Sequence, residues 1–154
     1  NPLIKSWIAF FRDARLFHMA DKALVRHRLP VTLRHRIDHL AERLDTWASE
    51  PSAPALLHGD LWGGNILYAN SRITGFIDPA LYFGAPEIEL AFLTLFNTFS
   101  SVFFDRYKEH HGLNPGFFEE RRDIYNLYPL LVHIQLFGDA YLEPLHQTLA
   151  KYGC

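Results

Sequence analysis

The fold of this chain is decided by the stretch from residue 57 to residue 78, which reads LHGDLWGGNILYANSRITGFID. It passes from the end of a strand, through a glycine-rich loop, into two short β-prone runs that a polar turn separates. Three of its side chains carry oxygen atoms that could share one site: Asp60, Asn65 and Asp78. A carboxylate, an amide oxygen and a second carboxylate are the groups that phosphoryl transfer from a Mg-nucleotide requires.

The spacing inside the loop favours a kinase-type site. Asp60 and Asn65 stand five residues apart, as in the kinase pattern H-x-D-x-x-x-x-N. Gly59, Gly63 and Gly64 allow that loop to turn tightly at little steric cost. The alternative is that the His-Gly-Asp triplet is an ordinary turn without a catalytic role.

The second half of the stretch predicts a β-hairpin. Residues 66–68 and 73–77 are β-prone, and residues 69–72 suit a turn. A hairpin returns the chain, so we expect Asp78 to lie beside Asn65, with two oxygen ligands a few ångströms apart. The alternative reading of Asp78 is a cap for the helix that follows.

Further segments accompany this stretch, at residues 77–80, 82–84, 87–91, 93–96, 125–128 and 136–138. Together with the motif at residues 56–65, they resemble the fructosamine kinase family, also called fructosamine/ketosamine-3-kinases. This family belongs to the protein-kinase-like and aminoglycoside-phosphotransferase-like superfamily. Asp60 and Asn65 are signals of the superfamily, whereas Trp62 and the Asp-Pro-Ala triplet point to the family. The resemblance covers nearly the whole chain.

The resemblance implies roles for the central residues. Asp60 would be the catalytic base, and Asn65 and Asp78 would bind Mg²⁺ that accompanies ATP. Leu67 and Ile77 would form the floor under the adenine ring. For these two residues an ordinary place in the hairpin core is an equal alternative.

Three further residues have implied roles around the loop. His58 and Glu89 would support the catalytic loop, because Glu89 stands where relatives carry an acid that holds the loop backbone. The alternative for Glu89 is an acid favoured by the dipole of a helix N-terminus. Trp62 would contact the substrate.

Composition limits the class of protein. The chain has 154 residues, 49% of them hydrophobic, and a net charge of −2, which argues against nucleic acid as the main partner. No apolar run is long enough to span a membrane and no signal peptide is visible. The single Cys154 fits a reducing cytoplasm. The chain starts at Asn1 rather than at Met, so we expect a processed or truncated product.

Helical periodicity fills most of the remaining chain. We expect helices at residues 3–29, 31–49, 86–111, 117–136 and 139–151, with residues 79–86 as a loop. Ile88, Phe92, Leu95, Phe99 and Val102 should form the buried stripe of the third helix, and Pro129 should kink or divide the fourth. The predicted fold class is mostly α (α+β): a protein-kinase-like C-terminal lobe with one small β-hairpin that carries the catalytic and metal-binding loops.

Several parts of a complete kinase have no counterpart in the sequence. It contains no glycine-rich phosphate loop and no strand-borne lysine before Asp60. We therefore interpret residues 1–154 as a C-terminal lobe alone, inactive by itself, with the ATP-binding N-terminal lobe absent. The nucleotide face would then be uncovered, which favours weak self-association.

The resulting functional hypothesis is an ATP-dependent small-molecule kinase. Its acceptor would be a sugar hydroxyl of a ketosamine such as fructosamine or ribulosamine, a small-molecule sugar-amine substrate. One alternative keeps the superfamily but takes an aminoglycoside, choline or another small alcohol. The other is a non-catalytic binding module that retains the kinase loop.

Overall fold

The structure, a computed structural model, describes residues 3–154. Asn1, on which the expectation of a processed start depends, lies outside the described residues. The chain forms two compact units. The first consists of the residues up to Pro51 together with Asn126–Cys154, and the second of Ser52–Tyr125. Each unit is described by itself.

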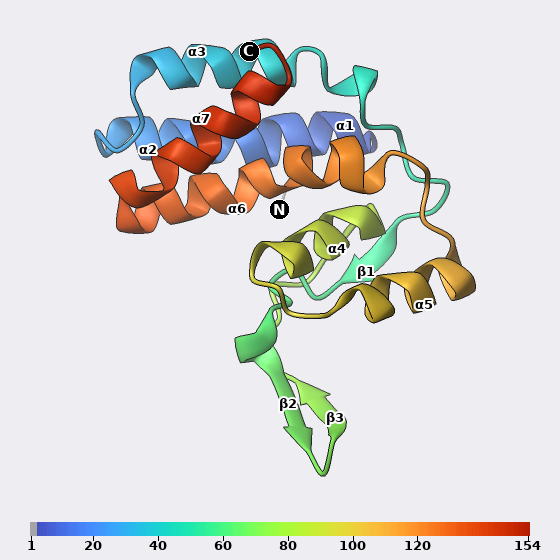
Figure 1. Cartoon of the computed structure of the whole chain (residues 1–154). Helices are drawn as coiled ribbons and strands as arrows, with labels where there is room; N and C mark the ends of the chain where they lie inside the picture. The colour runs from blue at the N-terminus through green and yellow to red at the C-terminus, as the bar shows by residue number, and fades with distance from the viewer. Residues whose placement is uncertain (1–2) are drawn as a thin grey trace. The chain divides into compact units, whose positions relative to one another are not determined.

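The first unit is built of helices (Figure 1). Its elements are α1 (Trp7–Phe10), the π-helical segment η1 (Phe11–Phe17), α2 (His18–Val25), α3 (Val31–Ala41), the 3-10 turns η2 (Leu44–Thr46) and η5 (Asp139–Tyr141), α7 (Leu142–Lys151) and most of α6 (Arg122–Phe137). The segments α1, η1 and α2 follow one another without a break, and α3 packs against α2 and α7. Its almost fully buried core contains Phe11, Leu16, Ile37, Leu40, Leu44, Leu127, Leu131 and Ile134.

The first helix begins at Trp7, four residues later than expected, because side chains cap it there. The hydroxyl of Ser6 accepts a hydrogen bond from the Ala9 amide at 3.1 Å. The Glu50 carboxylate accepts hydrogen bonds from the amides of Trp7 (2.6 Å) and Ile8 (3.2 Å) and from the Ser6 hydroxyl (2.6 Å). Burial by itself raises the pKa of Glu50, but these hydrogen bonds outweigh it and hold the pKa below its ordinary value.

The same continuous helix ends at Val25, four residues earlier than expected. His27 adopts the left-handed conformation with φ of 56°. The amide of His27 donates to the Leu24 carbonyl and the amide of Arg28 to the Ala23 carbonyl, both at 2.9 Å. This is the Schellman closure of a helix, here with histidine in the position that glycine usually takes.

The helix α3 is also shorter than its apolar pattern, which we expected to continue to residue 49. It ends at Ala41, and the 3-10 turn η2 follows. Leu44 and Ala48 are nevertheless buried. The apolar pattern in the sequence thus marks buried residues correctly, although the α-helix has already ended. Trp47 then packs edge-on against the ring of Tyr152, with ring centroids 5.2 Å apart.

The second unit contains two small antiparallel sheets, where the sequence predicted one hairpin. The predicted hairpin is confirmed: β2 (Ile66–Ala69) pairs with β3 (Arg72–Phe76). The other sheet pairs β1 (Ala55–Leu57) with β4 (Tyr82–Gly84), and Leu57 lies opposite Tyr82. The expected loop at residues 79–86 therefore contains a strand, because the backbone there completes a ladder with a distant segment.

The hairpin turn consists of two residues, Asn70 and Ser71, both with positive φ (51° and 59°). Positive φ at both central positions is the requirement of a type I′ turn, whose twist matches that of the two strands. The register joins Ile66 to Phe76 and Ala69 to Arg72, with an irregularity next to Leu67. The turn therefore closes the hairpin as tightly as the sequence predicted.

The expected single helix at residues 86–111 is instead two helices, α4 (Pro86–Leu95) and α5 (Ser101–His111). Asn97 adopts φ of 50°, and the amide of Thr98 donates to the carbonyl of Leu93 at 3.0 Å. This Schellman closure ends α4 although the apolar pattern continues. The predicted buried stripe is confirmed only at Ile88, because Phe92, Leu95 and Phe99 are partly exposed and Val102 is exposed. The other buried residues of α4 are Leu90, Ala91 and Leu93.

The remaining helix of the second unit begins after the turn at Gly116. The π-helical segment η4 (Phe117–Arg121) leads directly into α6, which contains Pro129. α6 runs unbroken from Arg122 to Phe137, so the expected division at Pro129 does not occur. The predicted last helix is present as η5 and α7. A mostly helical fold is thus confirmed, and no helix within residues 3–154 has both the length and the hydropathy to cross a lipid bilayer.

Candidate active site

The loop that joins β1 to the hairpin is fixed to the segment that follows the hairpin. The amide of Ala80 donates a hydrogen bond to the carbonyl of His58 at 2.8 Å. Gly59 has φ of +82°, and a Cβ atom at this position would lie 2.2 Å from the carbonyl oxygen of Ala80. A glycine is therefore required here twice, by its backbone conformation and by the close approach of a neighbouring backbone.

Asp60 and Asn65 are in direct contact. The side-chain nitrogen of Asn65 donates to the Asp60 carbonyl at 2.8 Å and to the Asp60 carboxylate at 3.0 Å. The Asn65 side chain is buried, within the 3-10 turn η3 (Gly63–Asn65). Its amide oxygen accepts no hydrogen bond from the described part of the chain, so this oxygen is free for a ligand.

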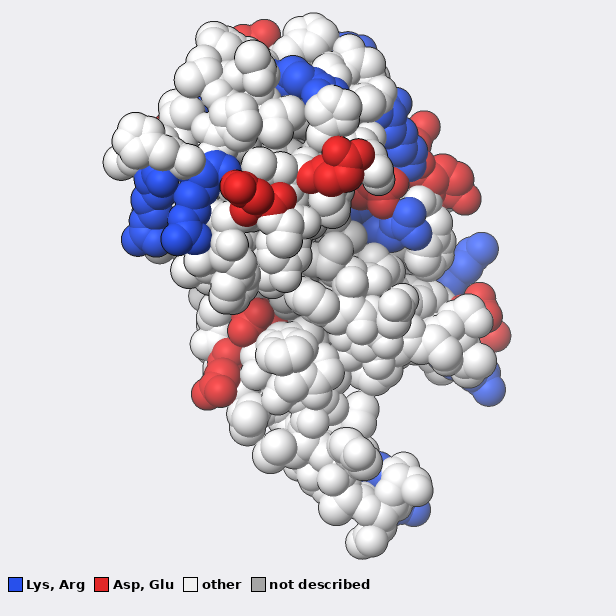
Figure 2. All heavy atoms as spheres, turned by 60° about the vertical axis from the view of Figure 1, so that its left-hand side comes forward, with Lys and Arg blue, Asp and Glu red and all other residues white. Residues whose placement is uncertain are grey.

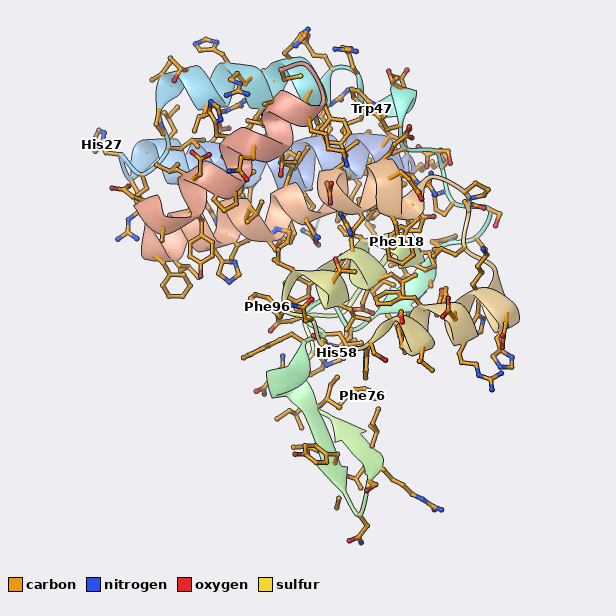
Figure 3. The ribbon with its side chains drawn as sticks, viewed as in Figure 1. His27, Trp47, His58, Phe76, Phe96 and Phe118 are labelled. Atoms are coloured by element: carbon orange, nitrogen blue, oxygen red, sulfur yellow. The ribbon has the colours of Figure 1, made fainter. Side chains whose placement is uncertain are left out.

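Backbone and side-chain hydrogen bonds connect the start and end of the hairpin. The amide of Ile77 donates to the Asn65 carbonyl at 3.0 Å. The His58 ring lies at the foot of the hairpin, near Phe76 (Figure 3). Its Nε2 lies 2.9 Å from the Ile77 carbonyl, and its Nδ1 lies 3.4 Å from the Asp60 amide. A carbonyl can only accept and an amide can only donate, so these contacts select the neutral tautomer with hydrogen on Nε2.

Asp78 follows this junction directly. It is exposed and adopts the left-handed conformation, with φ of 52°. The amide of the preceding residue, Ile77, donates to the Asn65 carbonyl. This hydrogen bond fixes the backbone immediately before Asp78. A left-handed conformation outside glycine costs about 1–3 kcal/mol and recurs at ligand sites.

Glu89 holds the backbone of the loop. Its carboxylate accepts a hydrogen bond from the His58 amide at 3.0 Å and another from the Gly59 amide at 2.6 Å. Both oxygen atoms are thus engaged by consecutive amides that immediately precede Asp60. The carboxylate lies in the first turn of α4, so the alternative role, an acid favoured by the helix dipole, operates together with this contact.

An aromatic cluster stands beside the loop. Trp62 is 40% exposed and contacts Phe96, which is 41% exposed, with ring centroids 5.8 Å apart. Phe92 packs edge-on against Phe96 at 5.5 Å. A Cβ atom on Gly64 would lie 2.4 Å from the Trp62 ring, so the ring packs closely against that glycine. Phe96 was not predicted as a site residue, although it ends the segment 93–96 that resembles the family.

A buried ion pair lies on the other side of the same helix. Arg121 donates to the Glu87 carboxylate from Nε at 2.6 Å and from Nη2 at 2.9 Å. This hydrogen-bonded pair raises the pKa of Arg121. Burial raises the pKa of Tyr107, and the negative charge of Glu87 adds to that rise. The sequence analysis missed the pair, because the two residues are far apart in the chain and no spacing rule connects them.

The hairpin that carries Leu67 and Ile77 is an exposed apolar surface. These two side chains are exposed, as are those of Tyr68, Ile73 and Phe76. Arg72 is the only charged residue between residues 66 and 77, and in Figure 2 the hairpin is correspondingly almost free of charge. The alternative that Leu67 and Ile77 fill an ordinary hairpin core is therefore wrong.

The donor chemistry of the site fits Mg²⁺. This ion prefers carboxylate and amide oxygens and keeps several non-protein ligands. The Asn65 amide oxygen and the Asp78 carboxylate are groups of this kind. Within residues 3–154 no three His, Cys, Asp or Glu side chains gather in a group that could hold a metal. A bound Mg²⁺ would thus take its other ligands from water or phosphate.

The sequence of the chain also matches a known protein family. The chain matches the family model described as fructosamine kinase over residues 1–153. Because this match covers almost the entire chain, the chain belongs to the fructosamine kinase family.

Individual proteins that resemble the chain carry names from the same family. A probable ketoamine kinase of Staphylococcus aureus is 35% identical over 94% of this chain and 50% of its own length. The ketosamine-3-kinase of Mus musculus is 36% identical over 92% of this chain and 45% of its own length. A crystal structure of a Thermobifida fusca protein assigned as a fructosamine-3-kinase superposes with a TM-score of 0.88 at 33% identity, over 98% of this chain and 52% of that chain. The chain therefore spans about half the length of the relatives it matches.

Proposed function

We propose that this chain supplies the catalytic lobe of an ATP-dependent kinase that phosphorylates a sugar hydroxyl of a ketosamine, such as fructosamine or ribulosamine. The observation that carries the proposal is the contact between Asp60 and Asn65. The amide nitrogen turns toward the carboxylate and leaves the amide oxygen available. This is the arrangement expected when one residue accepts a proton and its neighbour binds the metal that accompanies ATP.

Asp60 acts as the general base. The acceptor hydroxyl loses its proton to the Asp60 carboxylate while its oxygen forms a bond to the γ-phosphorus of ATP. The bond from the γ-phosphorus to the bridging oxygen breaks, and ADP leaves with that oxygen. The Asn65 amide, which donates to the same carboxylate, fixes the direction in which Asp60 faces the hydroxyl.

Asn65 and Asp78 hold Mg²⁺ in this proposal. When bound, the ion would neutralise the negative charge that the phosphates carry. The hydrogen bond between the Ile77 amide and the Asn65 carbonyl supports this assignment, because it fixes the backbone beside both ligands. His58 and Glu89 support the loop, His58 through Ile77 and Glu89 through two consecutive amides.

The exposed hairpin supports the nucleotide part of the proposal. Leu67 and Ile77 would lie under the adenine ring, where an apolar surface is needed. The phosphate-binding loop and its lysine would belong to a second lobe, since the relatives are about twice as long as the matched region. The isolated chain would then be inactive and would associate weakly with itself through the uncovered hairpin.

Trp62 and the aromatic ring of Phe96 would face the acceptor. Both rings are partly exposed; Trp62 lies in the loop two residues after the proposed base, and Phe96 contacts it from the end of α4. Ring faces of this kind bind the C–H face of a sugar or the ammonium group of a sugar-amine. The names of the relatives, ketoamine kinase and ketosamine-3-kinase, point to the same substrate class. A cytoplasmic location, which the single Cys154 suits, is part of this proposal.

The direct test uses the full-length protein that the complete reading frame encodes. It is incubated with ATP, Mg²⁺ and fructosyl-lysine, ribulosyl-lysine, kanamycin or choline in separate reactions, and the products are identified by ³¹P NMR. We expect a sugar phosphate from the two ketosamines only. Phosphorylation of kanamycin or choline in preference would replace the proposed acceptor. Absence of phosphoryl transfer to all four would favour a non-catalytic binding module and overturn the proposal.

A further inference from the structure

One carboxylate binds the backbone of the loop before Asp60, and the position of that carboxylate is set by one turn of a helix. Glu89 accepts hydrogen bonds from the amides of His58 and Gly59 at 3.0 and 2.6 Å. It belongs to the first turn of α4, which begins at Pro86. Any shift or rotation of that turn would move the two amides, and with them the next residue, Asp60.

The first turn of α4 has no side-chain cap of its own. The residue before it is Ala85, which has no polar side chain that could bind the amides of the first turn. Besides the burial of Ile88, the turn therefore needs a polar anchor from elsewhere in the unit. Glu87 supplies this anchor, because its carboxylate is bound at both oxygens by Arg121.

Arg121 is itself rigidly held. Besides the two bonds to Glu87, its Nη1 donates to the Pro115 carbonyl and its Nη2 to the Asn114 carbonyl, both at 2.9 Å. The side chains of the pair are only 11% and 15% exposed. A planar guanidinium with four hydrogen bonds in a buried setting has one orientation, which a lysine could not reproduce.

The geometry of the helix makes this anchor effective. Glu87 and Glu89 are two residues apart, so their side chains leave the helix about 200° from each other. One side of the turn is therefore fixed by Arg121, while the opposite side holds the loop. Segment η4, which carries Arg121, also packs against α4.

We propose that Arg121 is a positioning residue for Asp60: through Glu87 it fixes the first turn of α4, and through Glu89 that turn fixes the catalytic loop. The part of this inference that concerns catalysis rests on the proposed function of Asp60. The part that concerns the loop backbone does not.

The backbone part is tested by hydrogen exchange of individual amides in the 154-residue chain. In Arg121→Met we expect the His58 and Gly59 amides to exchange about tenfold faster or more, relative to amides that exchange only on global unfolding. Arg121→Lys should give a smaller increase, because it keeps the charge but loses the two-pronged contact. Glu87→Gln, which preserves the fold most closely, should also accelerate the two amides.

A matched control distinguishes positioning from simple loss of stability. Arg34 pairs with Asp21 at 2.9 Å and with Asp38, and its side chain is 15% exposed, but it lies in the first unit. Arg34→Met should lower the free energy of unfolding without selective acceleration at His58 and Gly59. If Arg121→Met and Arg34→Met affect these two amides alike, Arg121 serves stability only and the inference is wrong.

The catalytic part is tested in the full-length protein. Arg121→Met should lower kcat about tenfold or more with little change in the KM for ATP, and Arg121→Lys should restore part of it. An unchanged kcat with accelerated exchange would overturn the catalytic part alone. Absence of turnover in the unsubstituted protein would instead count against the proposed function and leave the exchange result intact.

Discussion

The two units of this chain hold their residues in place by different means. In the first unit, large side chains such as Phe11, Leu16 and Leu131 are almost fully buried, and apolar packing predominates. In the second, the loop from His58 to Asn65 is held mainly by hydrogen bonds to backbone amides and carbonyls. Packing depends on volume and accepts many apolar sequences, whereas such bonds require particular atoms at particular places. The core of the first unit should therefore tolerate exchange of one apolar residue for another of similar volume. The loop of the second unit should not tolerate loss of its hydrogen-bonding groups.

The largest effect should come from the smallest chemical change in the loop. Asp60→Asn in the full-length protein should lower kcat by about 10²–10⁴-fold, because it removes the proton acceptor but leaves Asn65 and Asp78 unchanged. Nucleotide binding, measured by isothermal titration calorimetry, should persist. Asp105→Asn, an exposed acid on α5, is the control and should retain full activity. Comparable kcat values for the two variants would show that Asp60 is not the base.

A substitution in the packed core should act on stability instead. Leu131→Ala should lower the free energy of unfolding by about 2–5 kcal/mol, since it removes a fully buried side chain and leaves a cavity. Urea denaturation followed by circular dichroism measures the change. Val25→Ala, at an exposed position in the same unit, should change it by less than about 0.5 kcal/mol. Equal losses for both would show that burial of apolar side chains does not determine the stability of the first unit.

Glu50 tests a polar contact of the first unit. Hydrogen bonds hold its pKa below the ordinary value, so its stabilising contribution is complete above about pH 4.5 and is lost as the pH falls through the lowered pKa. Glu50→Gln should therefore lower the free energy of unfolding at pH 7, by about 1 kcal/mol or less for this exposed cap, and should make no difference in strong acid.

Denaturation of both proteins across this pH range is the measurement for Glu50. Glu42→Gln, another exposed carboxylate of the first unit, should behave like the unsubstituted chain throughout. A loss of stability in Glu50→Gln that is the same at every pH would mean that the carboxylate charge plays no part in the cap.

The smallest expected effect concerns the exposed hairpin. Leu67→Ser should reduce the weak self-association of the 154-residue chain, measured by sedimentation velocity over a range of concentrations. Val25→Ser changes an even more exposed apolar residue of the first unit and should leave association unchanged. A chain that stays monomeric at high concentration, whether or not it carries Leu67→Ser, would show that the hairpin is not a contact surface.

Local sequence rules predicted the parts of this fold that depend on local chemistry. The hairpin follows from two β-prone runs and a turn at Asn70, and the loop follows from its glycines. The break between α4 and α5 was missed because the apolar pattern continues through Asn97, whose backbone conformation ends the helix. Strand β4 was missed because three residues gain their strand conformation only by pairing with β1.

The candidate site also contains residues that local sequence predicts and residues that depend on long-range packing. Asp60, Asn65, Asp78 and Glu89 were identified from spacing and from family resemblance, since each stands in or near one continuous motif. The Glu87–Arg121 pair could not be found in this way, because its contact depends on how α4 and η4 pack. An ion pair between two segments that are distant in the chain leaves no periodic signal of its own in a single sequence.

The pairing of Leu57 with Tyr82 has a consequence for how this family can vary. The segment between these two residues comprises the catalytic-type loop and the hairpin, and two short strands close its base. Insertions or deletions at the tip of the hairpin would therefore change the size of the exposed apolar surface, which the proposed function places under the nucleotide, without altering the register of any helix. Under the proposed function, exchange of this segment between relatives, cut at the paired residues, should transfer the contacts made to the ligand without disturbing the helices.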